Sequence, residues 1–203
     1  MYNFILRKNS RKIDFCNKKS LLLQIENRNN IMQRVFLIGF MGAGKTSTGK
    51  ELSAKMKCSF IDLDLFIERR YHKNIRQIFE EKGEEYFREI ECKALREVAE
   101  FEDVVISTGG GTPCFHHNMM FMNKLGTTVY LKVSNEELVR RINLNKNARP
   151  LLKDFSGDQL SRFVEETLAK RRPFYEQAQI IFAAEMQTVA MDTSYLMRLL
   201  YNY

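Results

Sequence analysis

Short apolar runs alternate with longer amphipathic stretches along most of this chain. Five runs predict buried strands, at residues 35–38, 58–61, 104–107, 127–133 and 180–182. Stretches with apolar residues at three- and four-residue spacing lie between them and predict helices. Strands that alternate with helices pair in parallel through right-handed crossovers. We therefore expect an α/β fold, a five-stranded parallel sheet between helices in three α/β/α layers.

A glycine-rich loop follows the first predicted strand and precedes a predicted helix. It matches the phosphate-binding pattern G-x-x-x-x-G-K-[ST] and reads Gly39-Phe40-Met41-Gly42-Ala43-Gly44-Lys45-Thr46. Glycines let successive N–H groups turn toward an anion, and the helix N-terminus adds partial positive charge. Lys45 suits the β- and γ-phosphates, and the Thr46 hydroxyl suits Mg²⁺. This P-loop predicts a bound nucleotide and leaves the reaction open.

Two acids, Asp62 and Asp64, come at the end of the second predicted strand. Strand alternation places them on one side, at the sheet edge where α/β proteins bind ligands. They fit two interpretations, a pair serving a metal and a hydroxyl group, or a pair that caps a helix N-terminus. The D-x-D pattern alone does not choose between these.

Two further features carry candidate chemistry. Gly109, Gly110 and Gly111 follow the third strand, where the absence of side chains favours close approach of a ligand over a simple turn. Arg88 and Glu91 lie three residues apart on an amphipathic helix that begins near Gly83. By itself such spacing predicts an ordinary surface ion pair, worth roughly a few tenths of a kcal/mol.

Arginines also occur near the end of the chain. Arg149 lies in a loop-like stretch at about residues 145–157, and arginine-bearing loops near phosphate sites are candidate lids. Arg171 ends the next predicted helix and begins the sequence Arg171-Arg172-Pro173-Phe174-Tyr175.

Composition places the chain among soluble globular proteins, with 44% hydrophobic and 28% charged residues in 203. The net charge is +7, but residues 1–31 hold seven Lys/Arg and two acids, so most of the excess lies there. We expect residues 1–31 to be a basic, poorly ordered extension and residues 32–203 to form the domain. A transit-like segment or a true start at Met32 are the alternatives for the extension.

Four scattered cysteines suggest a reducing compartment, and no apolar run approaches the length of a membrane span. We therefore expect a cytoplasmic protein with no membrane partner. Nucleic-acid binding is supported only by the charge of the extension, so we do not expect it.

Together, these motifs in this order resemble the shikimate kinases, P-loop phosphotransferases of the nucleoside monophosphate kinase type. The resemblance covers residues 32–203 and implies transfer of the ATP γ-phosphate to the 3-hydroxyl of shikimate by a monomer. A kinase for another hydroxy acid, such as gluconate, and a nucleotide-binding module without catalysis are the alternatives. A substrate panel separates a shikimate kinase from a kinase for another hydroxy acid.

The resemblance also implies roles for individual residues. ATP would be held by Gly42, Ala43, Gly44, Lys45, Thr46, Ser47, Arg141 and Arg149, with Arg141 near the adenine. Mg²⁺ would be held by Thr46 and Asp62. Shikimate would be held by Asp64, Arg88, Gly110, Gly111 and Arg171, with Glu91 orienting Arg88. Asp64, Lys45 and Arg149 would be catalytic, with Asp64 accepting the hydroxyl proton and Arg149 closing over the transferring phosphate.

Overall fold

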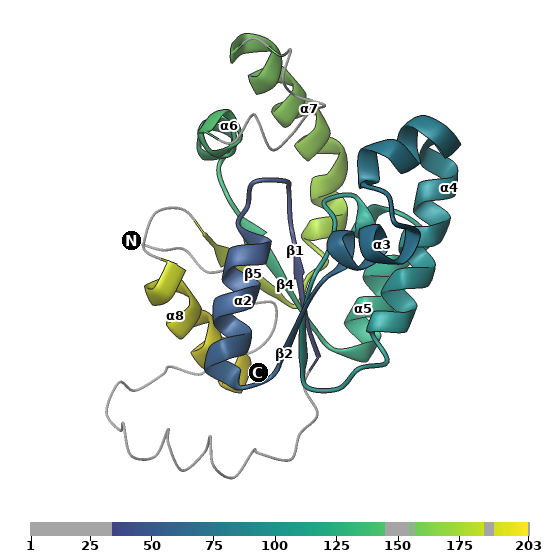
Figure 1. The fold of residues 1–203 in the computed structure, drawn as a ribbon. Coiled ribbons are helices and arrows are strands. Elements are labelled where there is room, and N and C mark those ends of the chain that lie inside the picture. The colour runs from purple at the N-terminus through teal and green to yellow at the C-terminus, as the bar shows by residue number, and fades with distance from the viewer. Residues whose placement is uncertain (1–33, 145–154, 156, 185–188, 203) are drawn as a thin grey trace.

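The computed structural model describes residues 34–144, 155, 157–184 and 189–202. Among these residues five parallel strands form one sheet in the order β2-β3-β1-β4-β5 (Figure 1). The strands are β1 (Arg34–Ile38), β2 (Ser59–Asp62), β3 (Val104–Ser107), β4 (Thr127–Lys132) and β5 (Ile180–Ala183). The predicted fold class is confirmed, and the strands lie within one or two residues of their predicted positions.

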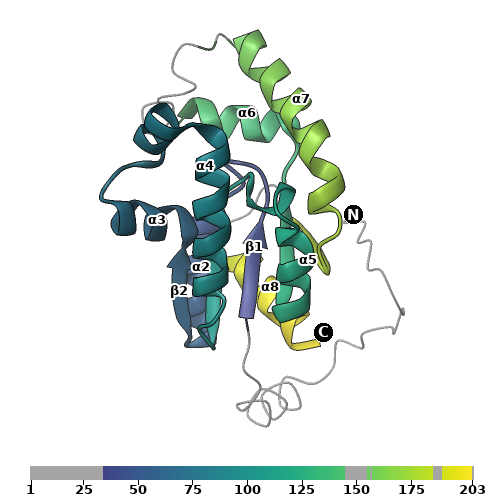
Figure 2. The same cartoon turned by 90° about the vertical axis from the view of Figure 1, so that its right-hand side faces the viewer.

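Helices cover both faces of the sheet. They are α2 (Lys45–Met56), α3 (Leu63–Tyr71), α4 (Ile75–Val98), α5 (Asn118–Leu125), α6 (Asn135–Leu144), α7 (Gly157–Tyr175) and α8 (Val189–Asn202), with a short 3₁₀ turn, η1 (Thr112–Cys114). Helices α2 and α8 pack together on one face, while α4 and α5 lie on the other (Figures 1 and 2). The predicted three layers are therefore present.

The central strands are buried on both faces, which explains their unbroken apolar sequences. In β1, Phe36, Leu37 and Ile38 are fully buried, as are Val104 and Val105 in β3. A parallel sheet covered by helices on both sides leaves no solvent-facing positions in its middle strands, so alternation of polar and apolar residues is not needed there.

Helix α4 is bent at Gly83, whose φ of 81° lies outside the helical region. This agrees with the predicted start of an amphipathic helix at that glycine. The preceding turns begin at a capping box, in which the Asn74 side chain accepts from the Gln77 N–H and the Gln77 side chain accepts from the Asn74 N–H. The alternation of strands and helices predicted a helix between β3 and β4, but no residues were assigned to α5 from the sequence.

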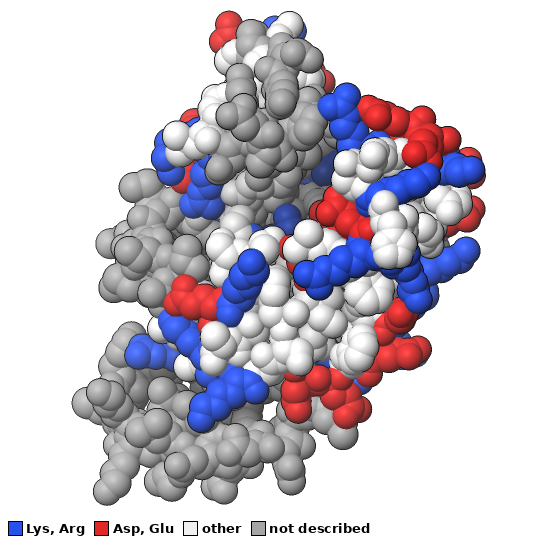
Figure 3. Space-filling view, in the orientation of Figure 1, with Lys and Arg blue, Asp and Glu red and all other residues white. Residues whose placement is uncertain are grey.

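Lysines and arginines are interspersed with acidic side chains over the described part of the face in Figure 3. The same view is hollowed beside the α3–α4 region, with charges of both signs near the hollow. Within the described ranges, no helix is long and apolar enough to cross a membrane.

Candidate active site

The predicted P-loop connects β1 to α2, as a strand–loop–helix motif requires. Gly42 and Gly44 have φ angles of 84° and 93°, a region that side chains with a Cβ rarely adopt. The Lys45 side chain is buried against the loop, where its Nζ donates to the carbonyl oxygens of Gly39 at 2.9 Å and Phe40 at 3.0 Å. The lysine is thus held at the loop that the sequence assigns to phosphate binding.

Thr46 and Ser47 are exposed in the first turn of α2. The Thr46 hydroxyl donates to the Asp62 carboxylate at 2.7 Å. Asp62 ends β2 and also caps α3, since its other oxygen accepts from the Leu65 N–H at 3.3 Å. Both interpretations of this acid therefore have structural support, because one oxygen caps the helix and the other faces Thr46.

The Thr46 and Asp62 pair fits a magnesium ion by the chemistry of its donors. Mg²⁺ prefers oxygen ligands and takes one or two from the protein beside substrate phosphates and water. A hydroxyl and a carboxylate oxygen lie 2.7 Å apart next to the P-loop. Among the described residues no group of three or more His, Cys, Asp or Glu side chains is placed to hold a metal ion.

Asp64 lies in the first turn of α3, not in the strand. The prediction that strand alternation places Asp64 on the same side as Asp62 was wrong, because the helix begins at Leu63, directly after Asp62. Asp64 is partly buried, and burial together with the negative charges of Glu91 and Asp62 raises its pKa to about 7, while Lys45 opposes the shift. A carboxyl group with this pKa exchanges its proton near neutral pH.

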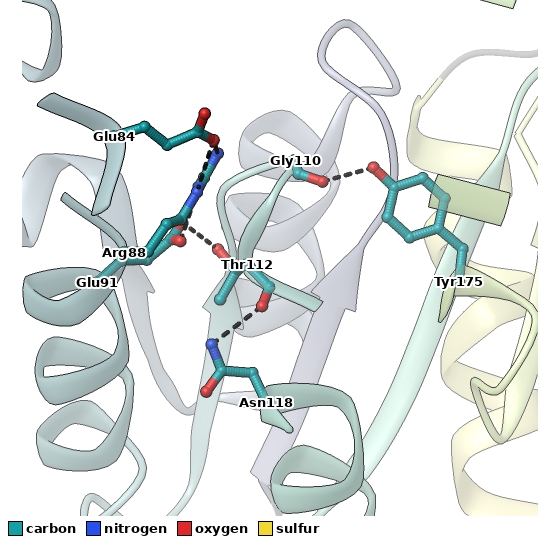
Figure 4. A network of polar contacts seen from close by, with 7 residues as sticks. All are labelled: Glu84, Arg88, Glu91, Gly110, Thr112, Asn118 and Tyr175. Atoms are coloured by element: carbon teal, nitrogen blue, oxygen red, sulfur yellow. Dashed lines mark hydrogen bonds and ion pairs between the residues drawn. The ribbon is translucent and has the colours of Figure 1, made fainter. Parts of the chain in front are cut away.

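Arg88 and Glu91 form a buried pair, where the sequence predicted a surface one. Arg88 Nη1 donates to Glu91 Oε2 at 2.8 Å, and the side chains are 9% and 1% exposed. The Thr112 hydroxyl donates to the second Glu91 oxygen at 2.6 Å (Figure 4). Removing one member of such a pair leaves a buried charge unmatched and costs about 3–5 kcal/mol, far above the surface value.

The three glycines after β3 are surrounded by these charged groups. A Cβ on Gly109 would lie 2.8 Å from Glu91 Oε1 and 2.9 Å from Asp64 Oδ1. One on Gly111 would lie 2.6 Å from the Arg88 nitrogens, closer than real Cβ atoms approach. The absence of side chains therefore makes room for the protein's own carboxylates and guanidinium, a reason that the sequence did not reveal.

Helix α7 reaches the same loop from the other side. It continues past Arg171 to Tyr175, further than predicted, and the Tyr175 hydroxyl donates to the Gly110 carbonyl oxygen (Figure 4). A Cβ on Gly110 would lie 3.3 Å from Arg171 Nη1. The structure thus brings Arg88 and Arg171, which are 83 residues apart in sequence, to adjoining glycines.

Arg141 reaches the P-loop from α6. Its Nη1 donates to the Ala43 carbonyl oxygen at 3.3 Å and its Nη2 to that of Ala184 at 3.0 Å. Its Nε donates to Glu137 at 2.6 Å. Hydrogen bonds from Arg140 and Arg141 lower the pKa of Glu137 to about 2. Arg149 and most of the predicted lid lie outside the described residues.

Three residues of this region were not singled out from the sequence: Glu84, Thr112 and Tyr175. Glu84 precedes Arg88 by four positions, a helical spacing that can signal an ion pair. Tyr175 was noted only as part of a longer motif. Thr112 carried no signal, since its partner Glu91 is 21 positions away.

A P-loop at the carboxyl ends of parallel strands, together with a cluster of carboxylates and arginines around the glycine run after β3, defines a P-loop phosphotransferase for a small anionic acceptor. The shikimate kinase family model matches residues 41–200. The chain therefore belongs to the shikimate kinase family.

Individual relatives agree with this assignment. A shikimate kinase of Parabacteroides distasonis is 62% identical over 161 residues, which are 79% of this chain and 93% of that protein. The crystal structure of shikimate kinase from Bacteroides thetaiotaomicron superimposes with a TM-score of 0.81 at 49% identity, covering 84% of this chain and 99% of that one.

Two other solved structures bear on the acceptor. Shikimate kinase from Acinetobacter baumannii in complex with shikimate has a TM-score of 0.77 at 31% identity, covering 88% of this chain and 97% of that one. A gluconokinase from Sinorhizobium meliloti has a TM-score of 0.51 at 17% identity, covering 84% and 94%. The gluconokinase likeness extends to the fold alone.

Proposed function

We propose that this protein transfers the γ-phosphate of ATP to the 3-hydroxyl of shikimate. The observation that carries the proposal is the convergence of Arg88 and Arg171 on Gly110 and Gly111. Two guanidinium groups beside a bare backbone suit a small carboxylate, because arginine can bind both carboxylate oxygens at once. Because the chain belongs to the shikimate kinase family, we identify the acceptor that carries this carboxylate as shikimate.

The P-loop forms the donor half of this site. Backbone N–H groups of Gly42, Ala43 and Gly44 bind the phosphates, and Lys45 exchanges its loop carbonyl partners for the β- and γ-phosphates. The first turn of α2 adds Thr46 and Ser47 to the nucleotide site. Arg141 contributes to the nucleotide site from α6, and Arg149 closes over the transferring phosphate.

Mg²⁺ would be held by Thr46 and Asp62 together with ATP. When bound, it would neutralise phosphate charge as the γ-phosphate leaves. The chain's own contribution is to present a hydroxyl and a carboxylate oxygen beside the P-loop.

Asp64 forms the reactive centre of the acceptor half. Its carboxylate accepts a hydrogen bond from the acceptor hydroxyl and takes up the proton that transfer releases. Arg88 and Arg171 bind the shikimate carboxylate, and backbone groups of Gly110 and Gly111 lie against the substrate. This arrangement fixes one hydroxyl near the phosphate, so catalysis relies on positioning and charge stabilisation.

A coupled ADP-release assay tests the proposal. We expect shikimate to stimulate ADP release well above that with ATP alone, and gluconate to give no stimulation. Lys45→Ala is the control, since it should abolish turnover with every acceptor. Stimulation by gluconate but not by shikimate would overturn the assignment of the acceptor.

We further infer that the protein acts as a monomer in the cytoplasm. The described cysteines, Cys58, Cys92 and Cys114, are free thiols, as suits a reducing compartment. Size-exclusion chromatography with light scattering tests the monomer, and fluorescence from a tagged chain tests the compartment.

A further inference from the structure

Arg88 is held between two carboxylates of very different surroundings (Figure 4). Its Nη1 donates to Glu91, while its Nε and Nη2 donate to one oxygen of Glu84 at 3.2 Å and 3.0 Å. The Glu91 side chain is 1% exposed, and that of Glu84 is 60% exposed. One carboxylate therefore lies inside the protein and the other in contact with water.

The inner carboxylate is fixed by further hydrogen bonds. Thr112 donates to Glu91 at 2.6 Å, and the Asn118 side chain donates to the Thr112 carbonyl oxygen at 3.0 Å. Thr112 and Asn118 are fully buried. Glu91 cannot leave Arg88 without placing an unpaired charge in the interior, which is strongly unfavourable.

The guanidinium itself is also confined. The Phe115 ring centroid lies 4.3 Å from Arg88 Cζ, and those of Phe87 and Phe79 lie at 5.2 Å and 5.8 Å. Gly111 packs so closely that a Cβ there would overlap the guanidinium. Any change of partner at Arg88 must therefore come from the partner and not from the arginine.

Glu84 is suited to such a change. It uses a single oxygen for both N–H groups, and Arg88 is its ion-pair partner among the described residues. A carboxylate that approached the same edge with both oxygens would form two parallel charge-assisted bonds, which is the stronger arrangement. A glutamate that is already 60% exposed loses little hydration or packing when it moves further into water.

We propose that Glu84 occupies the edge of Arg88 that takes the substrate carboxylate, and that substrate binding displaces it. The inference rests on the proposed function, in which Arg88 binds the carboxylate of shikimate. Glu84 keeps the arginine paired while the site is empty and weakens the apparent affinity for the substrate. It also adds specificity, because a hydroxylated compound without a carboxylate cannot replace the contact that it breaks.

Glu84→Gln tests the displacement. The neutral amide competes less well for the guanidinium, so KM for shikimate should fall about two- to fivefold, with kcat and KM for ATP unchanged. Glu85→Gln is the matched control, because it removes the same charge from the neighbouring exposed position. An unchanged or raised KM in Glu84→Gln, or an equal fall in Glu85→Gln, would overturn the proposal.

Loosening the fixed carboxylate of Glu91 should change KM for shikimate in the opposite direction. Thr112→Val removes the hydroxyl that holds Glu91, so KM for shikimate should rise roughly tenfold with KM for ATP unchanged, and Thr112→Ser should restore it. Thr128→Val controls for loss of a buried hydroxyl, since Thr128 is fully buried and its hydroxyl contacts Asn123. A KM unaffected by Thr112→Val would contradict the positioning role.

Failure of this inference is distinguishable from failure of the proposed function. Wild-type protein that does not phosphorylate shikimate would refute the function itself. Wild-type activity, combined with loss of shikimate affinity in Arg88→Ala and no effect of Glu84→Gln, would refute the displacement alone.

Discussion

The Thr46 hydroxyl and the Asp62 carboxylate form a hydrogen bond of 2.7 Å between the P-loop helix and the end of β2. These residues are 16 positions apart. The hydrogen bond joins the segment that follows β1 to the end of β2, and these two strands are not neighbours in the sheet, since β3 lies between them.

The first prediction concerns magnesium. Thr46→Ala and Asp62→Asn should each raise the Mg²⁺ concentration for half-maximal activity by roughly tenfold or more, because the first removes an oxygen ligand and the second replaces a charged carboxylate by a neutral amide. Asparagine also caps helices well, so Asp62→Asn should unfold at nearly the wild-type temperature. Mg²⁺ titrations of the rate, with thermal unfolding as control, measure both effects. An unchanged Mg²⁺ requirement would remove these residues from the metal site.

The second prediction concerns Asp64. Asp64→Asn should lower turnover by about 10²- to 10⁴-fold, because an amide cannot take up the proton of the acceptor hydroxyl. Its affinity for ATP should stay near the wild-type value, since Asp64 lies outside the P-loop. Steady-state rates and calorimetric ATP titrations separate the two quantities. Normal turnover in this variant would exclude Asp64 as the proton acceptor.

The third prediction concerns Gly111. Its backbone, with φ −90° and ψ −20°, accommodates alanine, so only the added methyl group matters. That methyl would lie 2.6 Å from the Arg88 nitrogens and should displace the guanidinium. We expect Gly111→Ala to raise KM for shikimate about tenfold or more while circular dichroism and KM for ATP stay unchanged. A variant with wild-type KM would show that Arg88 adjusts freely.

The fourth prediction is a dependence of stability on pH at Glu137. Its folded-state pKa of about 2 is below the ordinary value of 4.5, because Arg140 and Arg141 donate hydrogen bonds to its ionised form. A lowered pKa contributes stability above the unfolded-state value, and this stability is lost as pH falls toward 2. The stability difference between wild type and Glu137→Gln should therefore be constant above about pH 5 and shrink below it. Denaturant unfolding at several pH values measures it, and a difference that does not diminish between about pH 5 and pH 2 would contradict the prediction.

The fifth prediction concerns residues 1–31. We expect a chain that starts at Met32 to fold and to retain full activity, because the family match begins at residue 41 and the proposed site residues lie beyond that position. Parallel assays of the full and shortened chains test this. Insolubility or loss of activity in the shortened chain would give the basic extension a role in the domain.

Much of this site could be predicted because its residues lie in local motifs. The P-loop joins β1 to α2 as predicted, and Asp62, the glycine run and Arg171 are near the ends of the expected elements. Arg149 stays a prediction. Asp64 was wrongly assigned to the strand, because β2 ends at Asp62 and α3 begins at the next residue. Sequence patterns do not locate element boundaries that finely.

The sequence by itself determined the α/β class, the phosphate loop and the identity of the charged residues, because these depend on periodicity and on contiguous spacing. Only the tertiary structure decided that Arg88 and Glu91 are buried, that Thr112 and Asn118 fix them, and that Glu84 remains in water. Burial sets the energy of an ion pair, and it depends on which distant segments cover the pair. Helical spacing in sequence is the same for a surface pair and a buried one, so it carries no information about that difference.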